Sequence, residues 1–268
     1  MPPFIALLLG IVEGLTEYLP VSSTGHLILV SHWLGERDEG AAAFDIVIQL
    51  GAVLAVLVQY RVLLAERARG FLTRDPRSTQ LLLALGAAFV PTALAGFLLR
   101  KTIKHYLFGP LPVAAALIVG GVLMIVVERI RARKGIVGLV GLEHVTPLRG
   151  FWIGVGQCLS LWPGSSRSMC TIVTGQLTGL STGTAAEFSF LLALPVLGAA
   201  TVYEGWKARH ELTAGVGATS LAIGLVTSFL VAWAVIAVFI RYLKARGLEP
   251  FGYYRILLGV LVFWLMAR

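Results

Sequence analysis

Long apolar segments alternate along the chain with short polar connections that hold most of the charged residues. A helix that crosses a bilayer needs roughly 20 mostly apolar residues, and six segments reach or approach that length. They lie at 44–60, 80–99, 111–128, 186–204, 216–240 and 252–267. We predict that each of them spans a membrane.

Four further apolar segments are shorter and lie at 3–15, 21–34, 150–162 and 168–178. They form two pairs, and each pair is interrupted by a proline, Pro20 or Pro163. Such short segments are typical of re-entrant half-helices. Irregular backbone at membrane depth is tolerated only where it lines a cavity in the protein. The interruption around Pro20 is called the first tip below, and the one around Pro163 the second tip. Both tips are therefore predicted to line a site.

The second half of the chain repeats the first. Gly10–Thr16 (GIVEGLT) aligns with Gly154–Ser160 (GVGQCLS), and Pro20–Thr24 (PVSST) aligns with Pro163–Arg167 (PGSSR), which places Ser22 over Ser165. A repeat of this kind predicts two pseudo-symmetric halves with a site at their interface.

Each half, about 1–134 and about 147–268, is predicted to hold one re-entrant pair followed by three spans. Because three is an odd number, the two halves are inverted relative to each other. We therefore predict an all-α polytopic membrane protein with a single membrane domain, six transmembrane helices and two re-entrant helical hairpins in an inverted-topology repeat.

Composition agrees with this pattern, because 57% of the 268 residues are hydrophobic and only 13% are charged. Soluble domains hold about 25% charged residues. The formal net charge of +8 would suggest nucleic acid as the partner of a soluble chain. Here the cations fall in short connections, where they set topology and contact anionic headgroups. We expect membrane lipids as partners and no nucleic acid.

The distribution of lysine and arginine predicts the orientation. Thirteen of these residues fall in the connections 61–79, 129–149 and 241–251, against seven on the opposite side. Under the positive-inside rule the three connections face the cytoplasm. Both termini are then predicted to lie in the periplasm of a bacterium, with the protein in its inner membrane.

Glu13 and Glu17 stand four residues apart in the first short segment, which places both carboxylates on one helix face. Ionisable groups inside a membrane segment are costly and usually functional. The pair suits a hard divalent cation, Mg²⁺ or Ca²⁺, or general acid–base catalysis. A solvated face of a peripheral amphipathic helix is the alternative, but the rest of this segment is apolar and lacks Lys and Arg.

The first tip continues with Ser22, Ser23, Thr24 and His26. The proline ends one half-helix and a serine can cap the next, whose free N–H groups and positive dipole end favour phosphate. A serine cap without a ligand is the simpler interpretation. His26 can act as general base, general acid or nucleophile, or can bond a helix-end carbonyl.

The second tip carries a cation in place of the carboxylates. Arg167 lies in a predicted membrane segment, where a guanidinium is very costly without an anion, and it can bind phosphate in bidentate fashion. A salt bridge to Glu13 or Glu17 is the structural alternative. Gly164 permits a close backbone approach. Further hydroxyls come from Ser165, Ser166, Ser168 and Thr171.

Glu13–His26 (EGLTEYLPVSSTGH) resembles the first signature of the bacterial undecaprenyl-diphosphatase family, the bacitracin-resistance phosphatases that recycle the cell-wall lipid carrier. Pro163–Ser168 (PGSSRS) followed by Thr171 looks like the second signature, and Phe44–Gly51 also fits. The resemblance covers essentially the whole chain. One departure is Pro147–Gly150 (PLRG), where the family often has an acidic residue, so any role of that acid does not transfer.

The resemblance implies six spans with two re-entrant hairpins, a periplasmic active site, and removal of the terminal phosphate of undecaprenyl diphosphate with a divalent cation. Carried over to this chain, the functional residues are Glu13, Glu17, Ser23, His26 and Arg167. Glu13 and Glu17 are expected to hold the cation. Substrate binding is expected from Ser22, Thr24, Gly164, Ser165, Ser166, Ser168 and Thr171.

Three nucleophiles stay open at this point: Ser23, His26 and an activated water. A polyprenyl-phosphate transporter is the alternative function, because inverted repeats with broken helices near the midplane are the plan of many transporters. The oligomeric state also stays open, with a homodimer as one option.

Overall fold

The computed structural model describes residues 1–36, 39–107 and 109–266. This part of the chain is helical, with an isolated bridge between Leu139 and Leu180 and no strand. Its elements are α1 (Pro3–Thr16), α2 (Ser23–Trp33), α3 (Glu39–Val47), α4 (Gln49–Gln59), α5 (Arg61–Leu72), α6 (Pro76–Tyr106), α7 (Pro110–Arg133), η1 (Leu142–His144), α8 (Pro147–Gln157), η2 (Cys158–Leu161), α9 (Arg167–Leu177), α10 (Thr182–Lys207), α11 (Arg209–Glu211), η3 (Leu212–Val216), α12 (Ala218–Arg246) and α13 (Glu249–Met266).

Five helical segments of the described chain are long and apolar enough to cross a membrane. They are Gly40–Gln59, Pro76–Leu99, Pro110–Arg133, Thr182–Lys207 and Ala218–Leu243. The chain is therefore a multi-pass membrane protein. The sixth predicted span corresponds to α13, which is not among the five and contains Glu249 and Arg255; it stays a prediction.

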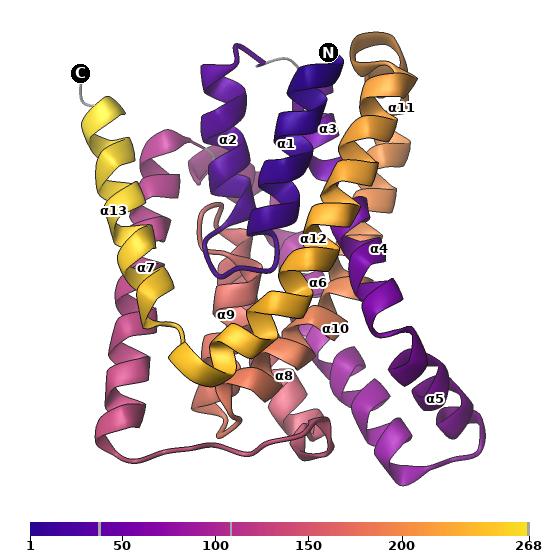
Figure 1. The fold of residues 1–268 in the computed structure, drawn as a ribbon, viewed down its shortest axis with the longest axis vertical. Coiled ribbons are helices and arrows are strands. Elements are labelled where there is room, and N and C mark those ends of the chain that lie inside the picture. Colours follow the sequence, from indigo (N-terminus) through magenta and orange to yellow (C-terminus); the bar gives the residue numbers. More distant parts are fainter. Residues whose placement is uncertain (37–38, 108, 267–268) are drawn as a thin grey trace.

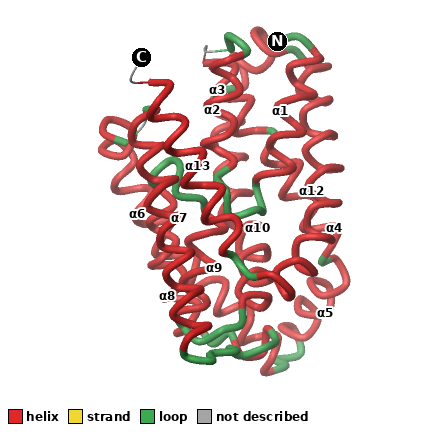
Figure 2. Tube along the Cα trace, turned by 60° about the vertical axis from the view of Figure 1, so that its left-hand side comes forward, coloured by secondary structure: helices red, strands yellow, loops and turns green. Residues whose placement is uncertain are grey.

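The helices stand side by side along the long axis of the molecule, with both termini at one end and α5 at the other (Figure 1). The loop between α1 and α2 turns in the middle of the bundle instead of at an end (Figure 1). Loop segments within the bundle are also visible in Figure 2. The two short helix pairs, α1–α2 and α8–α9, thus place their turns inside the protein.

Helices from the two halves of the sequence pack in pairs: α1 lies along α12, α8 along α6, and α13 along α7. Small residues permit the first two contacts. A Cβ at Gly10 or Gly14 would meet backbone oxygens of α12 at 2.8 and 2.7 Å, and a Cβ at Gly150 or Gly154 would clash with backbone oxygens of α6. Each glycine pair is spaced by four residues, the small-xxx-small pattern that lets membrane helices approach closely.

The two short helix pairs have the same register. The number of residues from the start of α1 to the start of α8 equals the number from the start of α2 to the start of α9. The ends of α2 and α9 are separated by the same number of residues. We call this the repeat interval. At the turns, Ser22 and Ser166 both have positive φ, 74° and 71°. Each serine hydroxyl accepts from the N–H three residues ahead, at 3.3 and 3.2 Å. Ser22 therefore corresponds to Ser166.

The predicted alignment of Ser22 with Ser165 is consequently wrong by one residue. The two tip prolines caused the error, because Pro20 and Pro163 occupy neighbouring positions in this register and not the same one. Proline fixes only its own φ and restricts the residue before it, so either position is tolerated next to such a turn. Backbone conformation and the capping bonds are the better guide to equivalence.

Candidate active site

The two tips touch each other in the interior. The Ser168 hydroxyl of α9 donates to the Leu19 carbonyl of the first tip at 2.9 Å. Beside this contact, Arg167 Nη2 forms an ion pair with Glu17 Oε1 at 3.0 Å, and the two side chains are only 8% and 6% exposed. The salt bridge considered as the structural alternative for Arg167 is therefore present between the tips, and its acid is Glu17.

Glu17 also binds the predicted nucleophile. Its second oxygen, Oε2, accepts from the Ser23 hydroxyl at 2.5 Å. Short O–H···O⁻ bonds of this kind are about twice as strong as neutral ones. One carboxylate thus links the first residue of α2 to the first residue of α9, and Ser23 and Arg167 hold equivalent positions in the two pairs.

Several groups hold Arg167 in place. Its Nη1 donates to the carbonyl and the hydroxyl of Ser189 on α10, at 2.8 and 3.2 Å. The Thr171 hydroxyl donates to the same Ser189 hydroxyl at 2.6 Å. The guanidinium carbon lies 5.5 Å from the centroid of the Tyr18 ring, an attractive cation–π distance. The arginine is therefore fixed before any ligand arrives.

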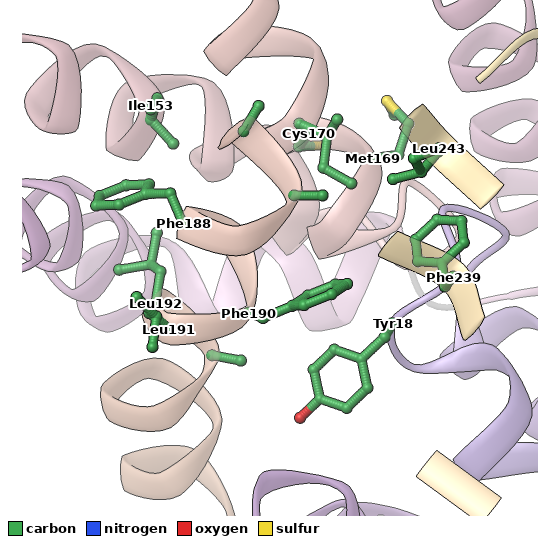
Figure 3. Packing of buried hydrophobic residues seen from close by; sticks show 14 of the residues in the cluster. Tyr18, Ile153, Met169, Cys170, Phe188, Phe190, Leu191, Leu192, Phe239 and Leu243 are labelled. Carbon is green, nitrogen blue, oxygen red and sulfur yellow. The ribbon is translucent and has the colours of Figure 1, made fainter. Parts of the chain in front are cut away.

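Tyr18 anchors this corner to the apolar core. Its hydroxyl donates to the Ala52 carbonyl at 2.8 Å, and its ring meets Phe190 edge-on with centroids 5.1 Å apart. Figure 3 shows Tyr18 beside Phe190 and Phe239. Since the core is packed around a residue next to Glu17, the position of the carboxylate is set by the fold.

A cavity of about 190 Å³ lies between the tips. Many of the predicted site residues line it, namely Glu17, Ser22, Ser23, Thr24, Gly164, Ser166 and Arg167. Gln49, Thr92, Ser160, Leu161, Pro163, Val196 and Leu197 complete the wall. Thr92 and Val196 each follow a proline inside a helix, Pro91 of α6 and Pro195 of α10. Such prolines interrupt the helical hydrogen bonds where both helices pass the cavity.

Other predicted residues support the cavity instead of lining it. The Ser168 and Thr171 hydroxyls bind Leu19 and Ser189 as described, and the Ser165 N–H donates to the Trp162 carbonyl at 3.0 Å. Gly164, which does line the cavity, has φ of 96°, and a Cβ there would meet the Val113 carbonyl at 2.6 Å. The close approach predicted for this glycine is therefore to α7.

Glu13 is fully buried beside the Glu17 carboxyl group, and neither of its own oxygens accepts from an N–H or O–H group of another residue in the described structure. The charged groups near it are Glu17, Asp45 and Arg167. A buried carboxylate without partners is costly and fits a position that receives a cation. No group of three or more His, Cys, Asp or Glu within the described residues could hold a metal ion. Two carboxylates fit Mg²⁺, which usually binds through one or two carboxylates together with substrate phosphates.

His26 is directed away from this centre. Its Nδ1 lies 2.8 Å from the Ser22 carbonyl oxygen and its Nε2 lies 2.7 Å from the Tyr254 hydroxyl. Because a carbonyl only accepts, Nδ1 carries the proton and Nε2 of the neutral ring accepts from Tyr254. The ring also stacks on Tyr254, and His26 is not part of the cavity wall. Within the described residues, His26 thus forms no hydrogen bond with Glu17, Ser23 or Arg167.

Sequence reasoning missed Arg255 of α13, which has no exposed surface. Its guanidinium donates to the carbonyls of Pro20 at 3.0 Å and Gly164 at 2.9 Å, one in each tip, and to two carbonyls of α7. The signal in the sequence was an arginine inside an apolar segment. Ser189 and Tyr254 were also missed, since serine and tyrosine are common in such segments.

The fold and site define a multi-pass membrane protein with a buried carboxylate–serine–arginine centre suited to an anionic group. The family model described as "Bacitracin resistance protein BacA" matches residues 6–261, and the chain belongs to that family. A protein named undecaprenyl-diphosphatase from Sorangium cellulosum is 61% identical over 98% of this chain and 86% of its own length. Two more proteins with that name are similar: one from Nitrosomonas eutropha at 46% identity (96% and 92% covered) and one from Caldanaerobacter subterraneus at 43% (98% and 96%).

Proposed function

We propose that this chain is an integral-membrane phosphatase that hydrolyses undecaprenyl diphosphate to undecaprenyl phosphate and inorganic phosphate. The names of its relatives support this function. The single structural observation that carries it is the Glu17 carboxylate, bound at once to the Ser23 hydroxyl and the Arg167 guanidinium in a buried cavity. Phosphoryl transfer needs a positioned nucleophile, a base and stabilisation of the phosphate charge, and these three residues supply them.

In the mechanism we propose, the Ser23 hydroxyl attacks the terminal phosphorus and passes its proton to Glu17. The bond from that phosphorus to the bridging oxygen breaks, and undecaprenyl phosphate leaves. Water then attacks phosphoserine, the Ser23 oxygen leaves and takes its proton back from Glu17, and inorganic phosphate is released. Arg167 exchanges its contact with Glu17 for the phosphate oxygens. A Mg²⁺ or Ca²⁺ ion held by Glu13 and Glu17 would neutralise part of the diphosphate charge.

The geometry favours Ser23 over His26 as the nucleophile, because the Ser22 carbonyl and the Tyr254 hydroxyl occupy both nitrogens of His26, which is not part of the cavity wall. An activated water remains the other route.

The transporter alternative rests on the shared register of the two helix pairs, since repeats of this kind occur in transporters.

The finer topology belongs to the same proposal. We place α1–α2 and α8–α9 as two re-entrant hairpins between six spans, in two inverted halves. The positive-inside rule puts the arginine-rich end that contains α5 in the cytoplasm. The termini and the opening of the cavity then face the periplasm across the bacterial inner membrane.

Phosphate release by the purified protein in detergent tests the proposed function. The wild type should release phosphate from undecaprenyl diphosphate, and Glu17→Gln should reduce the rate by about 10²- to 10⁴-fold, the usual share of a general base. Glu66→Gln on α5, an exposed acid, is the control. A wild-type protein that moves the lipid between leaflets but releases no phosphate would be a transporter.

A further inference from the structure

The cavity has two chemically different walls. The polar groups described above, Glu17, Ser23 and Arg167, form one. The same cavity is also lined by apolar residues, Leu161 of η2 and the successive residues Val196 and Leu197 of α10. An anion alone gains nothing from such residues, whereas ligand pockets usually combine apolar walls with a few placed polar groups.

In the common register of the two helix pairs, the polar wall and the apolar wall contain residues at equivalent positions. Leu161 follows Glu17 by the repeat interval that relates α1 to α8 and α2 to α9. The two residues therefore occupy equivalent positions, one in each tip, and both line the one cavity. The first tip has a carboxylate at this position and the second tip has an isobutyl group. This difference gives the cavity one ionic side and one apolar side.

The size of the cavity limits what it can hold. Its volume of about 190 Å³ is below the roughly 300–1,000 Å³ of pockets that enclose drug-sized ligands. A polyprenyl chain of many units cannot fit inside. The space suits a diphosphate with the beginning of its apolar chain, and the rest of the chain must extend beyond the cavity.

We propose that Leu161, Val196 and Leu197 bind the isoprenoid unit next to the diphosphate. This inference rests on the proposed function, because it assigns the apolar part of that substrate. It makes the second tip a recognition element as well as the source of Arg167.

The test compares Leu161→Ala with Leu159→Ala in the same turn of η2. Leu159 is 59% exposed and is not part of the cavity wall. With farnesyl diphosphate in detergent, Leu161→Ala should raise KM about tenfold or more, since one methylene in such a pocket already changes discrimination by roughly 10- to 200-fold. The value of kcat should stay within about threefold, the sign of lost uniform binding.

A second readout separates the two walls. Inorganic diphosphate has no apolar chain, so its inhibition constant should be the same in Leu161→Ala and the wild type. If Leu161→Ala and Leu159→Ala have equal KM, or if inhibition by inorganic diphosphate weakens in parallel with KM, the inference is wrong.

Two further variants guard against misfolding. Leu161→Met keeps the apolar volume and should retain the wild-type KM, and Val196→Ala should raise KM in the same way as Leu161→Ala. Failure of the proposed function looks different, because the wild type itself would then release no phosphate.

Discussion

The two tips share a backbone and differ in chemistry. Both turn at a serine with positive φ whose hydroxyl caps the following helix. The residue after that serine is Ser23 in the first tip and Arg167 in the second, and both bind Glu17. Side chains at equivalent positions thus have different roles, although the backbone conformation at the two turns is the same.

A second equivalent pair shows what the divergence costs. Gln157 follows Glu13 by the same repeat interval. It is fully buried and donates through Nε2 to the Thr92 hydroxyl at 2.8 Å, while its Oε1 has no partner in the described structure. Glu13 is equally buried, but its oxygens have no partner in the described structure. The amide nitrogen in α8 has a structural partner, whereas neither oxygen of the carboxylate in α1 has one, and this carboxylate is kept at a cost, as expected of a functional group.

The largest effect is expected at Ser23. Replacing it by alanine removes the nucleophile and should lower kcat at least about a thousandfold, as for other nucleophilic serines. Ser31→Ala in the same helix removes a hydroxyl that binds Asp45 and should cost far less. Phosphate release gives the rates, and acid-quenched mass spectrometry should find phosphoserine at position 23 in the wild type. Full incorporation of solvent oxygen in the first step, without a phosphoenzyme, would rule out this nucleophile.

Arg167→Lys tests the other side of the comparison. Lysine keeps the charge but loses the planar fork that reaches both Glu17 and Ser189. We expect kcat/KM for undecaprenyl diphosphate to fall about a hundredfold, in line with the loss of one oriented donor to a developing charge. Arg149→Lys, which alters an arginine bound to the Thr178 carbonyl at the end of α9 and the His144 carbonyl of η1, should leave kcat/KM close to that of the wild type. Equal losses in both variants would show a general effect of basic residues.

Arg255→Lys tests whether Arg255 positions the two tips without taking part in the reaction. A lysine ammonium cannot reach carbonyls in both tips, so buried acceptors lose their donors at a cost of about 2 kcal/mol in stability. We expect a lower midpoint of thermal unfolding and about a tenfold lower kcat, because the tips shift relative to each other. Arg129→Lys, at an exposed ion pair with Glu249, should change neither quantity appreciably. A normal kcat in Arg255→Lys would contradict the positioning role.

The smallest effect is expected at the pair of His26 and Tyr254. Tyr254→Phe removes only the hydroxyl that binds His26 Nε2, so kcat should stay within about threefold of the wild type. Since the imidazole is not part of the cavity wall, His26→Asn should cost about tenfold at most, far below the range for a general base. A thousandfold loss in His26→Asn with correct folding would make His26 the catalytic residue and reverse the order of the predictions.

Much of this arrangement could be read from the sequence. Buried charges are rare in membrane segments, so Glu13, Glu17 and Arg167 stood out, and the repeat predicted that the tips would meet. Two features of the site could not be predicted from the sequence. Periodicity does not give the rotamer of His26, which depends on a tyrosine 228 positions further on. The one-residue register of the tips depends on backbone dihedral angles that proline positions do not fix.

The pairing of Glu17 with Arg167 is the central claim, because it joins the two tips into one site. A double-mutant cycle tests it most directly, with kcat/KM for undecaprenyl diphosphate measured in the wild type, Glu17→Gln, Arg167→Lys and the double variant. Groups that contact each other show non-additive losses. We predict that the double variant is hardly worse than the poorer single variant, a coupling of about 2 kcal/mol. Losses that simply add would show that the two tips act independently and would contradict a single site.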